Sequence, residues 1–257
     1  MDHLAKLAED ARNRVERGYY ETGPTILRTH RSLSKAIQES RSNAIITEVK
    51  FSSPSHGKIR DTEPASVISQ SMVKGGACAL SVLTEPDNFN GGLKTLSEVA
   101  EKTDVPVVMK DIIVSPGQLE AGSRAGADAV VIVSEVLERG LGLVGLEKIL
   151  SEARRHGLEV LAEANGIVDF LKLRKYNPDL YGINNRNLST FQLELSTTEK
   201  ILREAGKLDR PVVSESGISS TFDIRRLRKA GANAFLVGTS IMKSSDIEAK
   251  VRELVQA

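Results

Sequence analysis

The sequence predicts an α/β protein, a (β/α)8 barrel of the TIM type, and the first observation behind it is a set of repeated strands. Eight short apolar runs, rich in β-branched residues, occupy 44–50, 77–83, 106–110, 128–133, 158–163, 179–184, 211–215 and 233–238. Helical segments separate them. Their near-continuous apolar character is typical of parallel strands covered on both faces, and eight strand–helix units close such a barrel.

The second observation is a sequence pattern that repeats within the chain. A basic helix end, a glycine stop, an alanine and an apolar strand follow one another in 74–83, 124–133 and 229–238. From Gly76 to Gly126 is 50 residues, and from Gly126 to Gly231 is 105. These spacings are close to two and four βα units of about 25 residues each, as a repeated barrel requires.

The domain organisation follows from this rhythm. Residues 1–257 are predicted to form a single domain, in which 44–257 are the barrel and 1–43 are a helical extension packed on it. Two helices are expected in the extension, at roughly 2–17 and 31–41, with Gly23-Pro24 as the breaker between them.

Two of the predicted helices carry start signals. Ser115-Pro116-Gly117-Gln118 places a capping serine, a proline at the first helical position and a glutamine at the third. Ser196-Thr197-Thr198-Glu199 matches a capping box. We expect a helix to begin at each site.

Composition narrows the class of protein. The chain has 35 basic and 34 acidic residues, a net charge of +1, which argues against a nucleic-acid surface or a polybasic membrane patch. No apolar run approaches the roughly 20 residues that span a bilayer, and the charged first 17 residues lack a signal-peptide core. The single Cys78 suggests a reducing compartment. We expect a cytoplasmic protein, a monomer or a simple homo-oligomer, without membrane or nucleic-acid partners.

Metal and cofactor sites are not predicted. The four histidines are scattered, without metal-ligand spacing among themselves or with Cys78. Gly140 to Gly145 match the dinucleotide pattern G-x-G-x-x-G, but residues 134–139 separate them from the preceding strand. Because that pattern needs its first glycine at the strand end, we interpret the segment as a surface loop.

Polar side chains cluster where the predicted strands end. They are Glu48, Lys50, Lys110, Glu163, Asn184, Arg186, Glu215, Ser216, Gly238 and Thr239. In (β/α)8 barrels the chemistry lies at the carboxyl ends of the strands. Any single charge there also suits a structural salt bridge at the rim, but two lysines and three glutamates converging on one mouth favour an acid–base site.

The last two strands add a candidate anion site. Ser216-Gly217 follow the seventh strand and Gly238-Thr239 the eighth, where backbone N–H groups can approach a phosphate. Residues 240–243 could form the short helix that often completes such a site. The alternative is that the glycines serve only tight turns. Ser53 and Ser55 either assist phosphate binding or cap the next turn.

Together these motifs resemble one known family. The stretches 46–55, 83–91 and 109–111, Glu163, 182–188, 215–218 and 237–239 look like those of indole-3-glycerol phosphate synthase. The resemblance covers 44 to about 243 in the correct order, and the helical extension also suits that family. It implies ring closure, decarboxylation and dehydration of 1-(2-carboxyphenylamino)-1-deoxyribulose 5-phosphate in tryptophan biosynthesis, without a cofactor or metal.

The resemblance also implies roles for individual residues. The catalytic set is Lys110 as general acid, Glu163 in the later dehydration, Lys50 with Glu48 in acid–base exchange and orientation, Asn184, and Glu215 on the hydroxylated chain. The substrate-binding set, for the anthranilate part and the rest of the sugar phosphate, is Arg186, Phe89, Ser53, Pro54, Val131 and Leu188. The phosphate-binding set is Ser216, Gly217, Gly238 and Thr239.

The sequence departs from the family pattern at two positions. Ile112 stands where an aromatic residue is common, and Val131 is smaller than the usual leucine. Both are expected on the apolar wall that meets the substrate's rings. Two alternatives remain open: a sugar-phosphate isomerase of the related barrels, which has no use for Glu48-x-Lys50 with Asn184-x-Arg186, and a non-catalytic sugar-phosphate-binding barrel.

Overall fold

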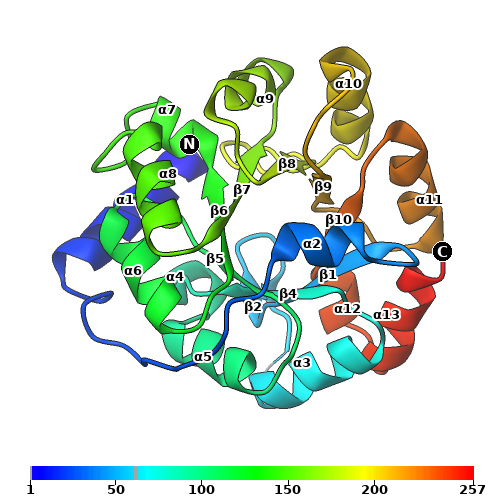
Figure 1. The fold of residues 1–257 in the computed structure, drawn as a ribbon, viewed down its shortest axis with the longest axis horizontal. Coiled ribbons are helices and arrows are strands. Elements are labelled where there is room, and N and C mark those ends of the chain that lie inside the picture. Colours follow the sequence, from blue (N-terminus) through cyan, green and yellow to red (C-terminus); the bar gives the residue numbers. More distant parts are fainter. Residues whose placement is uncertain (1, 61–62) are drawn as a thin grey trace.

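A computed structural model of the chain describes residues 2–60 and 63–257 and contains the predicted barrel (Figure 1). Within these residues, eight parallel strands close a ring, and each lies within two residues of its predicted range. Their bounds are β1 (Ala44–Val49), β4 (Ala79–Leu83), β5 (Val107–Lys110), β6 (Ala129–Val133), β7 (Glu159–Ala164), β8 (Leu180–Asn184), β9 (Val212–Glu215) and β10 (Ala234–Val237).

Helices surround this ring and cover its outer face (Figure 1). They are α3 (Ala65–Lys74), α4 (Pro86–Phe89), α5 (Leu93–Glu101), α6 (Pro116–Arg124), α7 (Ser134–Glu138), α8 (Leu146–Arg155), α9 (Ile167–Leu173) with the 3-10 turn η1 (Arg174–Tyr176), α10 (Ser196–Ala205), α11 (Thr221–Ala230), α12 (Thr239–Met242) and α13 (Ile247–Val255). The extension supplies α1 (His3–Glu16) and α2 (Leu33–Gln38). An antiparallel hairpin that the sequence did not predict, β2 (Ser52–Ser53) with β3 (Gly57–Lys58), follows β1.

The helix-start predictions have different outcomes. Ser115 and Gln118 form the predicted capping box at α6. The capping box predicted at Ser196 is wrong, because Leu195 holds the N-cap position in a helical conformation without a side-chain cap. Asn185, just beyond the end of β8, supplies the missing acceptor. Its Oδ1 accepts a hydrogen bond from the backbone N–H of Thr198 at 3.2 Å. The cap therefore comes from a residue 13 positions earlier, at the start of the loop that leads into α10, which a four-residue pattern does not reveal.

Alternate residues of the strands fill the barrel interior. A buried apolar cluster combines inward-facing positions with two residues of α2; its members are Leu33, Ile37, Ala44, Ile46, Ala79, Val108, Ala129, Val131, Leu161, Leu180, Val213, Ala234 and Leu236. Small residues such as Ala44 and Ala234, paired across β1 and β10, leave room for Leu33 and Ile37. Helix α2 therefore seals the amino-terminal end of the barrel.

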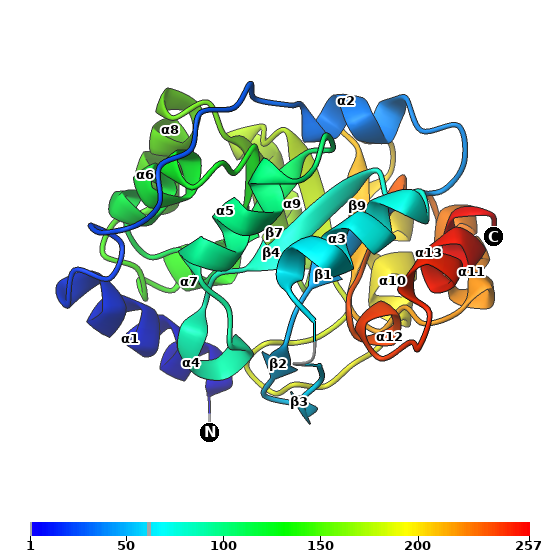
Figure 2. The ribbon, with the colours of Figure 1, turned by 90° about the horizontal axis from the view of Figure 1, so that it is seen from below.

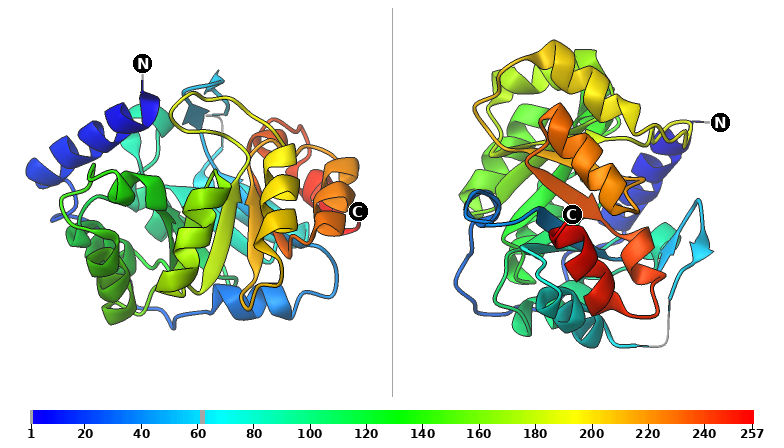
Figure 3. Two further views of the ribbon diagram at one scale, coloured as in Figure 1. Left: turned by 90° about the horizontal axis from the view of Figure 1, so that it is seen from above. Right: turned by 90° about the vertical axis from the view of Figure 1, so that its right-hand side faces the viewer.

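The extension reaches both ends of the barrel. Helix α1 lies beside α4 at the end that carries the β2–β3 hairpin, whereas α2 lies at the opposite end (Figures 2 and 3). The segment between α1 and α2 is fixed by Arg28, whose guanidinium lies 2.8 Å from Asp128. At the start of α2, Ser32 and Ser34 donate hydrogen bonds to Glu159. One segment of the chain thus connects the floor of the barrel with its mouth.

The seal at the floor predicts a stability effect. Leu33→Ala should lower the free energy of unfolding by about 2–5 kcal/mol, because it leaves a cavity under the strands where the leucine is fully buried. Leu27→Ala is the matched control, since Leu27 is 100% exposed and its loss should change the free energy by less than about 0.5 kcal/mol. Urea unfolding of both variants measures the difference, and equal effects would contradict the seal.

Candidate active site

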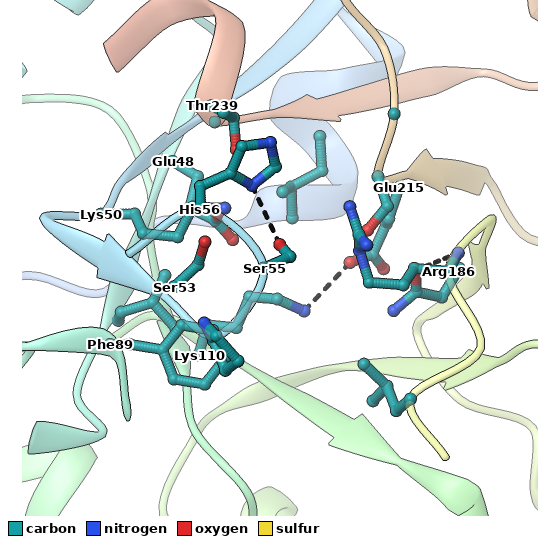
Figure 4. A pocket seen from close by; sticks show the side chains of 18 of the residues that line it. Glu48, Lys50, Ser53, Ser55, His56, Phe89, Lys110, Arg186, Glu215 and Thr239 are labelled. Atoms are coloured by element: carbon teal, nitrogen blue, oxygen red, sulfur yellow. Dashed lines mark hydrogen bonds and ion pairs between the residues drawn. The ribbon is translucent and has the colours of Figure 1, made fainter. Parts of the chain in front are cut away.

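A pocket of about 390 Å³ opens at the carboxyl ends of the strands, within the range of small-molecule sites (Figure 4). Its lining includes every site residue predicted from sequence except Val131. The predicted residues in the lining are Glu48, Lys50, Ser53, Pro54, Phe89, Lys110, Glu163, Asn184, Arg186, Leu188, Glu215, Ser216, Gly217, Gly238 and Thr239. The topology thus brings together side chains up to 191 residues apart, as between Glu48 and Thr239.

Four charged side chains form the top layer of the barrel. Glu48, Lys110, Glu163 and Glu215 come from β1, β5, β7 and β9, which are alternate strands of the ring. Each follows by two positions a buried apolar residue of the interior, namely Ile46, Val108, Leu161 and Val213. Because inward residues of alternate strands meet in one layer of such a barrel, the side-chain period of two places all four charges at one height.

Lys110 is the centre of this layer. Its Nζ lies 2.9 Å from Glu163 Oε2 and 3.1 Å from Glu215 Oε2. Burial lowers the pKa of Lys110, but the charges of Glu163, Glu215 and Glu48 outweigh burial and raise it above the ordinary value. The lysine is therefore held as an ammonium, in position to donate a proton or a hydrogen bond into the pocket.

The pKa of Glu215 is also raised, which for a carboxyl group favours the neutral form. Burial raises the pKa of this carboxyl, with Lys110 lowering it and Glu163 raising it further. Its Oε1 is buried and accepts no hydrogen bond from the residues that the structure describes. An unpaired buried acceptor at the floor of a pocket is a place for a ligand hydroxyl, because leaving it unpaired costs free energy.

Two glycines make room for the carboxylates. A Cβ on Gly182 would lie 2.7 Å from Glu215 Oε1, and a Cβ on Gly238 would lie 2.5 Å from Glu48 Oε1. Glu48 in turn pairs with Lys50, with 2.6 Å between Oε1 and Nζ. Gly182 within β8 and Gly238 after β10 are thus required because the carboxylates of the top layer lie close to their Cα atoms. This requirement is independent of any turn that the glycines form.

Asn184 links the acid–base centre to the loop after β8. Its Nδ2 donates to Glu163 Oε1 at 2.7 Å, and its Oδ1 accepts from the backbone N–H of Arg186 at 2.9 Å. The Arg186 guanidinium donates to the carbonyl of Phe191 at 3.1 Å and forms no ion pair with any described carboxylate. A half-buried guanidinium without an acidic partner is suited to a ligand carboxylate.

The predicted anion site lies next to the loop after β8, because β9 neighbours β8 in the ring and the Asn185 side chain donates to the carbonyl of Ser216 at 3.1 Å. Ser216 and Gly217 follow β9 with φ of +70° and +78°, and α12 begins at Thr239, close to the predicted position of the short helix. The Ser53 hydroxyl, buried and without a hydrogen-bond partner among the described residues, also lines the pocket. These groups could receive an anion that carries several acceptor oxygens.

A buried ionic network attaches helix α1 to the mouth. Arg14 Nη1 lies 2.6 Å from both Glu85 Oε1 and Asp87 Oδ2, and its Nη2 lies 3.7 Å from Asp111 Oδ1. Tyr20 donates to Asp111 Oδ2 at 2.9 Å. Since Asp111 directly follows Lys110, the extension fixes the end of the strand that carries the ammonium.

Sequence reasoning missed Arg14 and misplaced Val131. Arg14 continues the apolar stripe of α1 after Leu7 and Ala11, and a charge on such a stripe was the available signal. Val131 is fully buried and pairs with Leu161, one layer below the charges, so its placement on the pocket wall is wrong. Val133, two positions further on and paired with Glu163, lines the pocket instead, together with Ile112.

Other sequence-based interpretations can be placed on the structure. Helix α7 separates β6 from Gly140, so the glycine-rich segment starts a turn away from the strand end, and the surface-loop interpretation is confirmed. Among residues 2–60 and 63–257, no three His, Cys, Asp or Glu side chains are arranged to hold a metal ion. No helix in the described part is long and apolar enough to cross a membrane.

The fold and its mouth define a (β/α)8-barrel protein with a pocket of paired lysines and glutamates, and comparison with known proteins narrows this class. Residues 3–254 match the sequence profile of indole-3-glycerol phosphate synthase. The synthase of Methanocaldococcus jannaschii is 41% identical over 227 residues, which are 87% of this chain and 82% of that protein. The synthase of Methanopyrus kandleri is 38% identical over 230 residues, 88% of each. The chain belongs to the indole-3-glycerol phosphate synthase family.

Solved structures support the fold alone. An N-acetylmannosamine-6-phosphate 2-epimerase from Clostridium perfringens superimposes with a TM-score of 0.62 at 12% identity, covering 83% of this chain and 93% of that one. A thiamine phosphate pyrophosphorylase from Pyrococcus furiosus gives a TM-score of 0.59 at 18% identity, covering 84% of this chain and 94% of that one. At these identities the similarity shows a shared barrel and gives no support to the isomerase alternative.

The network around Asp111 predicts a pH dependence of stability. Burial raises the pKa of Asp111 to about 6, against the lowering effects of Arg14, Thr84 and Tyr20. A native pKa above the unfolded value means that the folded protein binds more protons, so stability is greatest below the unfolded pKa and falls as pH rises through about 6. The free energy of unfolding of wild type should therefore decrease relative to Asp111→Asn by about 3 kcal/mol between about pH 4 and 7.

Urea unfolding over this pH range measures that difference. Glu120→Gln is the matched control, because Glu120 is exposed and forms no ion pair with the described residues. Its difference from wild type should stay constant. An Asp111→Asn difference that is also independent of pH would contradict the assigned pKa of Asp111.

Proposed function

We propose that this protein is an indole-3-glycerol phosphate synthase, a carboxy-lyase of tryptophan biosynthesis. It would convert 1-(2-carboxyphenylamino)-1-deoxyribulose 5-phosphate into indole-3-glycerol phosphate, carbon dioxide and water. The observation that carries the proposal is the Lys110 ammonium held between Glu163 and Glu215 in the pocket of a chain that belongs to this family. Arg186 after β8 and the small residues after β9 and β10 offer separate groups for the two charged ends of the substrate.

The substrate lies across the pocket in this proposal. The carboxylate of its anthranilate part binds the unpaired guanidinium of Arg186, with Leu188 and Phe89 against the ring. Ser216, Gly217, Gly238 and Thr239, with Ser53 and Pro54 nearby, receive the phosphate. This arrangement leaves the sugar ketone over the top layer, where the Lys110 ammonium is.

Ring closure requires a proton at the ketone oxygen. The aromatic carbon that bears the carboxylate attacks the ketone carbon, and Lys110 protonates the oxygen as it becomes an alkoxide. Loss of carbon dioxide then returns the electron pair of the broken C–C bond to the ring. General acid catalysis of such a step typically contributes ~10²–10⁴-fold to the rate.

Dehydration completes the indole. The new hydroxyl must leave as water, so it needs a proton, and the ring must lose one. Glu163 is hydrogen-bonded to both Lys110 and Asn184, which suits it to proton transfer in this step. Lys50 with Glu48 supports acid–base exchange beside it. The unpaired Oε1 of Glu215 accepts a hydrogen bond from a hydroxyl of the sugar chain and orients that hydroxyl.

The compartment of the protein is inferred from its single cysteine. Cys78 is a free thiol, and burial raises its pKa to about 12, which keeps it unreactive. A reducing compartment such as the cytoplasm suits a chain with this one unpaired cysteine.

Turnover is the direct test of the proposed function. Incubation of the purified protein with the anilino-deoxyribulose phosphate should produce indole fluorescence and release one carbon dioxide per product formed. The same assay without phosphate on the substrate is the control for site-specific binding. A folded protein that binds the substrate without forming indole would reject the synthase and leave the non-catalytic alternative.

The role of Lys110 has a separate test. Lys110→Ala should reduce kcat by ~10²–10⁴-fold, because the alkoxide then forms without its acid. Binding of inorganic phosphate should remain within about threefold of wild type, since Lys110 is not among the residues of the predicted anion site. Lys102→Ala, an exposed lysine after α5, is the control and should keep full turnover. Near-normal kcat in Lys110→Ala would contradict the acid assignment.

A further inference from the structure

The tip of the β2–β3 hairpin places a histidine at the mouth of the pocket. The turn is closed by the N–H of His56, which donates to the carbonyl of Ser53 at 3.2 Å, and Gly57 follows with φ of +60°. Pro54 at the second turn position favours this geometry. His56 lines the pocket, and Figure 4 shows its ring on the side where Thr239 lies.

The imidazole is oriented by one neighbour and has one nitrogen available. Its Nδ1 lies 2.9 Å from Ser55 Oγ. Nε2 forms no hydrogen bond with any residue of the described part of the chain. A histidine whose first nitrogen is held by a hydroxyl presents the second to a ligand.

Three cations from separate elements act on the exposed imidazole of His56. Lys243 at the end of α12, Arg186 in the loop after β8 and Lys50 after β1 act on the imidazole, and no described carboxylate does. Burial first, and then these three cations, lower the pKa of His56. Lys50 is neutralised by Glu48, and Arg186 is assigned above to the substrate carboxylate, so Lys243 is the cation of the three that remains for the phosphate. A remaining cation beside an imidazole with a free nitrogen is complementary to an anion.

We propose that His56 is a proton-linked ligand of the substrate's phosphate: its imidazole takes up a proton when the dianion binds beside Ser53 and Thr239. The inference rests on the proposed function, because it concerns the phosphate end of that substrate. It assigns to the hairpin tip a binding role that the sequence left open between phosphate contact and turn formation.

The physical basis is linkage between the two equilibria. A dianion next to the imidazole reverses the local field, so it favours the imidazolium that the three cations disfavour. By reciprocity, protonation must strengthen anion binding by the same factor. Each unit by which the bound anion raises the pKa of His56 corresponds to a tenfold change in affinity between the two protonation states.

Sulfate is the appropriate probe, because it remains a dianion throughout the range in which histidine and phosphate both titrate. In wild type, its dissociation constant should increase by about tenfold from about pH 5.5 to 8. NMR of the histidine ring protons should show the midpoint of His56 moving up by about one pH unit or more at saturating sulfate. The midpoints of His30 and His156 should stay unchanged and serve as internal references.

Two substitutions of His56 distinguish the effect of its positive charge on sulfate binding from the effect of its hydrogen bond. His56→Gln keeps a neutral donor and should bind sulfate with a weak affinity independent of pH. His56→Lys keeps a permanent charge and should bind tightly, also independent of pH. His156→Gln is the matched control, because His156 follows α8 at the opposite end of the barrel, and it should retain the wild-type slope.

An unchanged His56 midpoint in the presence of sulfate would overturn the proposal, and so would a wild-type slope in His56→Gln or an absence of saturable sulfate binding. These readouts do not involve turnover. A protein that shows the sulfate linkage but no synthase activity retains the anion site and loses only the proposed reaction. Turnover without the linkage refutes the histidine alone.

Discussion

The structure depends on the neutralisation of one buried layer of charge at the top of the barrel. Lys110 lies within hydrogen-bond distance of Glu163 and Glu215, and its positive charge offsets the cost of holding these two carboxyl groups out of water. The layer requires glycine at 182 and 238, where a Cβ would meet a carboxylate oxygen. It also requires the apolar layer below, which fixes the height of each charge. Geometry that is costly for stability is thus used to hold an ammonium where a substrate can reach it.

The extension serves this layer from outside the barrel. Arg14 and Tyr20 of the extension hold Asp111, the neighbour of Lys110, while α2 fills the opposite end under the same strands. At the start of α1, His3 stacks on Phe191, whose carbonyl accepts a hydrogen bond from Arg186. The extension therefore contacts both the end of the strand that carries Lys110 and the loop that carries the unpaired guanidinium, and its role goes beyond covering apolar surface.

Most of the barrel and its charged mouth could be predicted from sequence, because both depend on local patterns. Apolar runs define the strands, and charges at their ends must gather at one rim once eight strands close. The residues that were missed or misplaced depend on contacts between distant segments. Arg14 needs Glu85 and Asp111, the start of α10 needs Asn185, and the choice between Val131 and Val133 needs the register of β6 against β7. No local pattern contains these distances.

The protonation of Lys110 is the quantity on which the proposed chemistry depends most directly. Heteronuclear NMR of the lysine Nζ and Cε nuclei, assigned by comparison with Lys110→Ala, would follow this group through a pH titration. The ion pairs with Glu163 and Glu215 predict that Lys110 remains an ammonium throughout the neutral range and titrates above an ordinary lysine. Deprotonation of Lys110 near neutral pH would contradict the assignment of this residue as the acid held ready for ring closure.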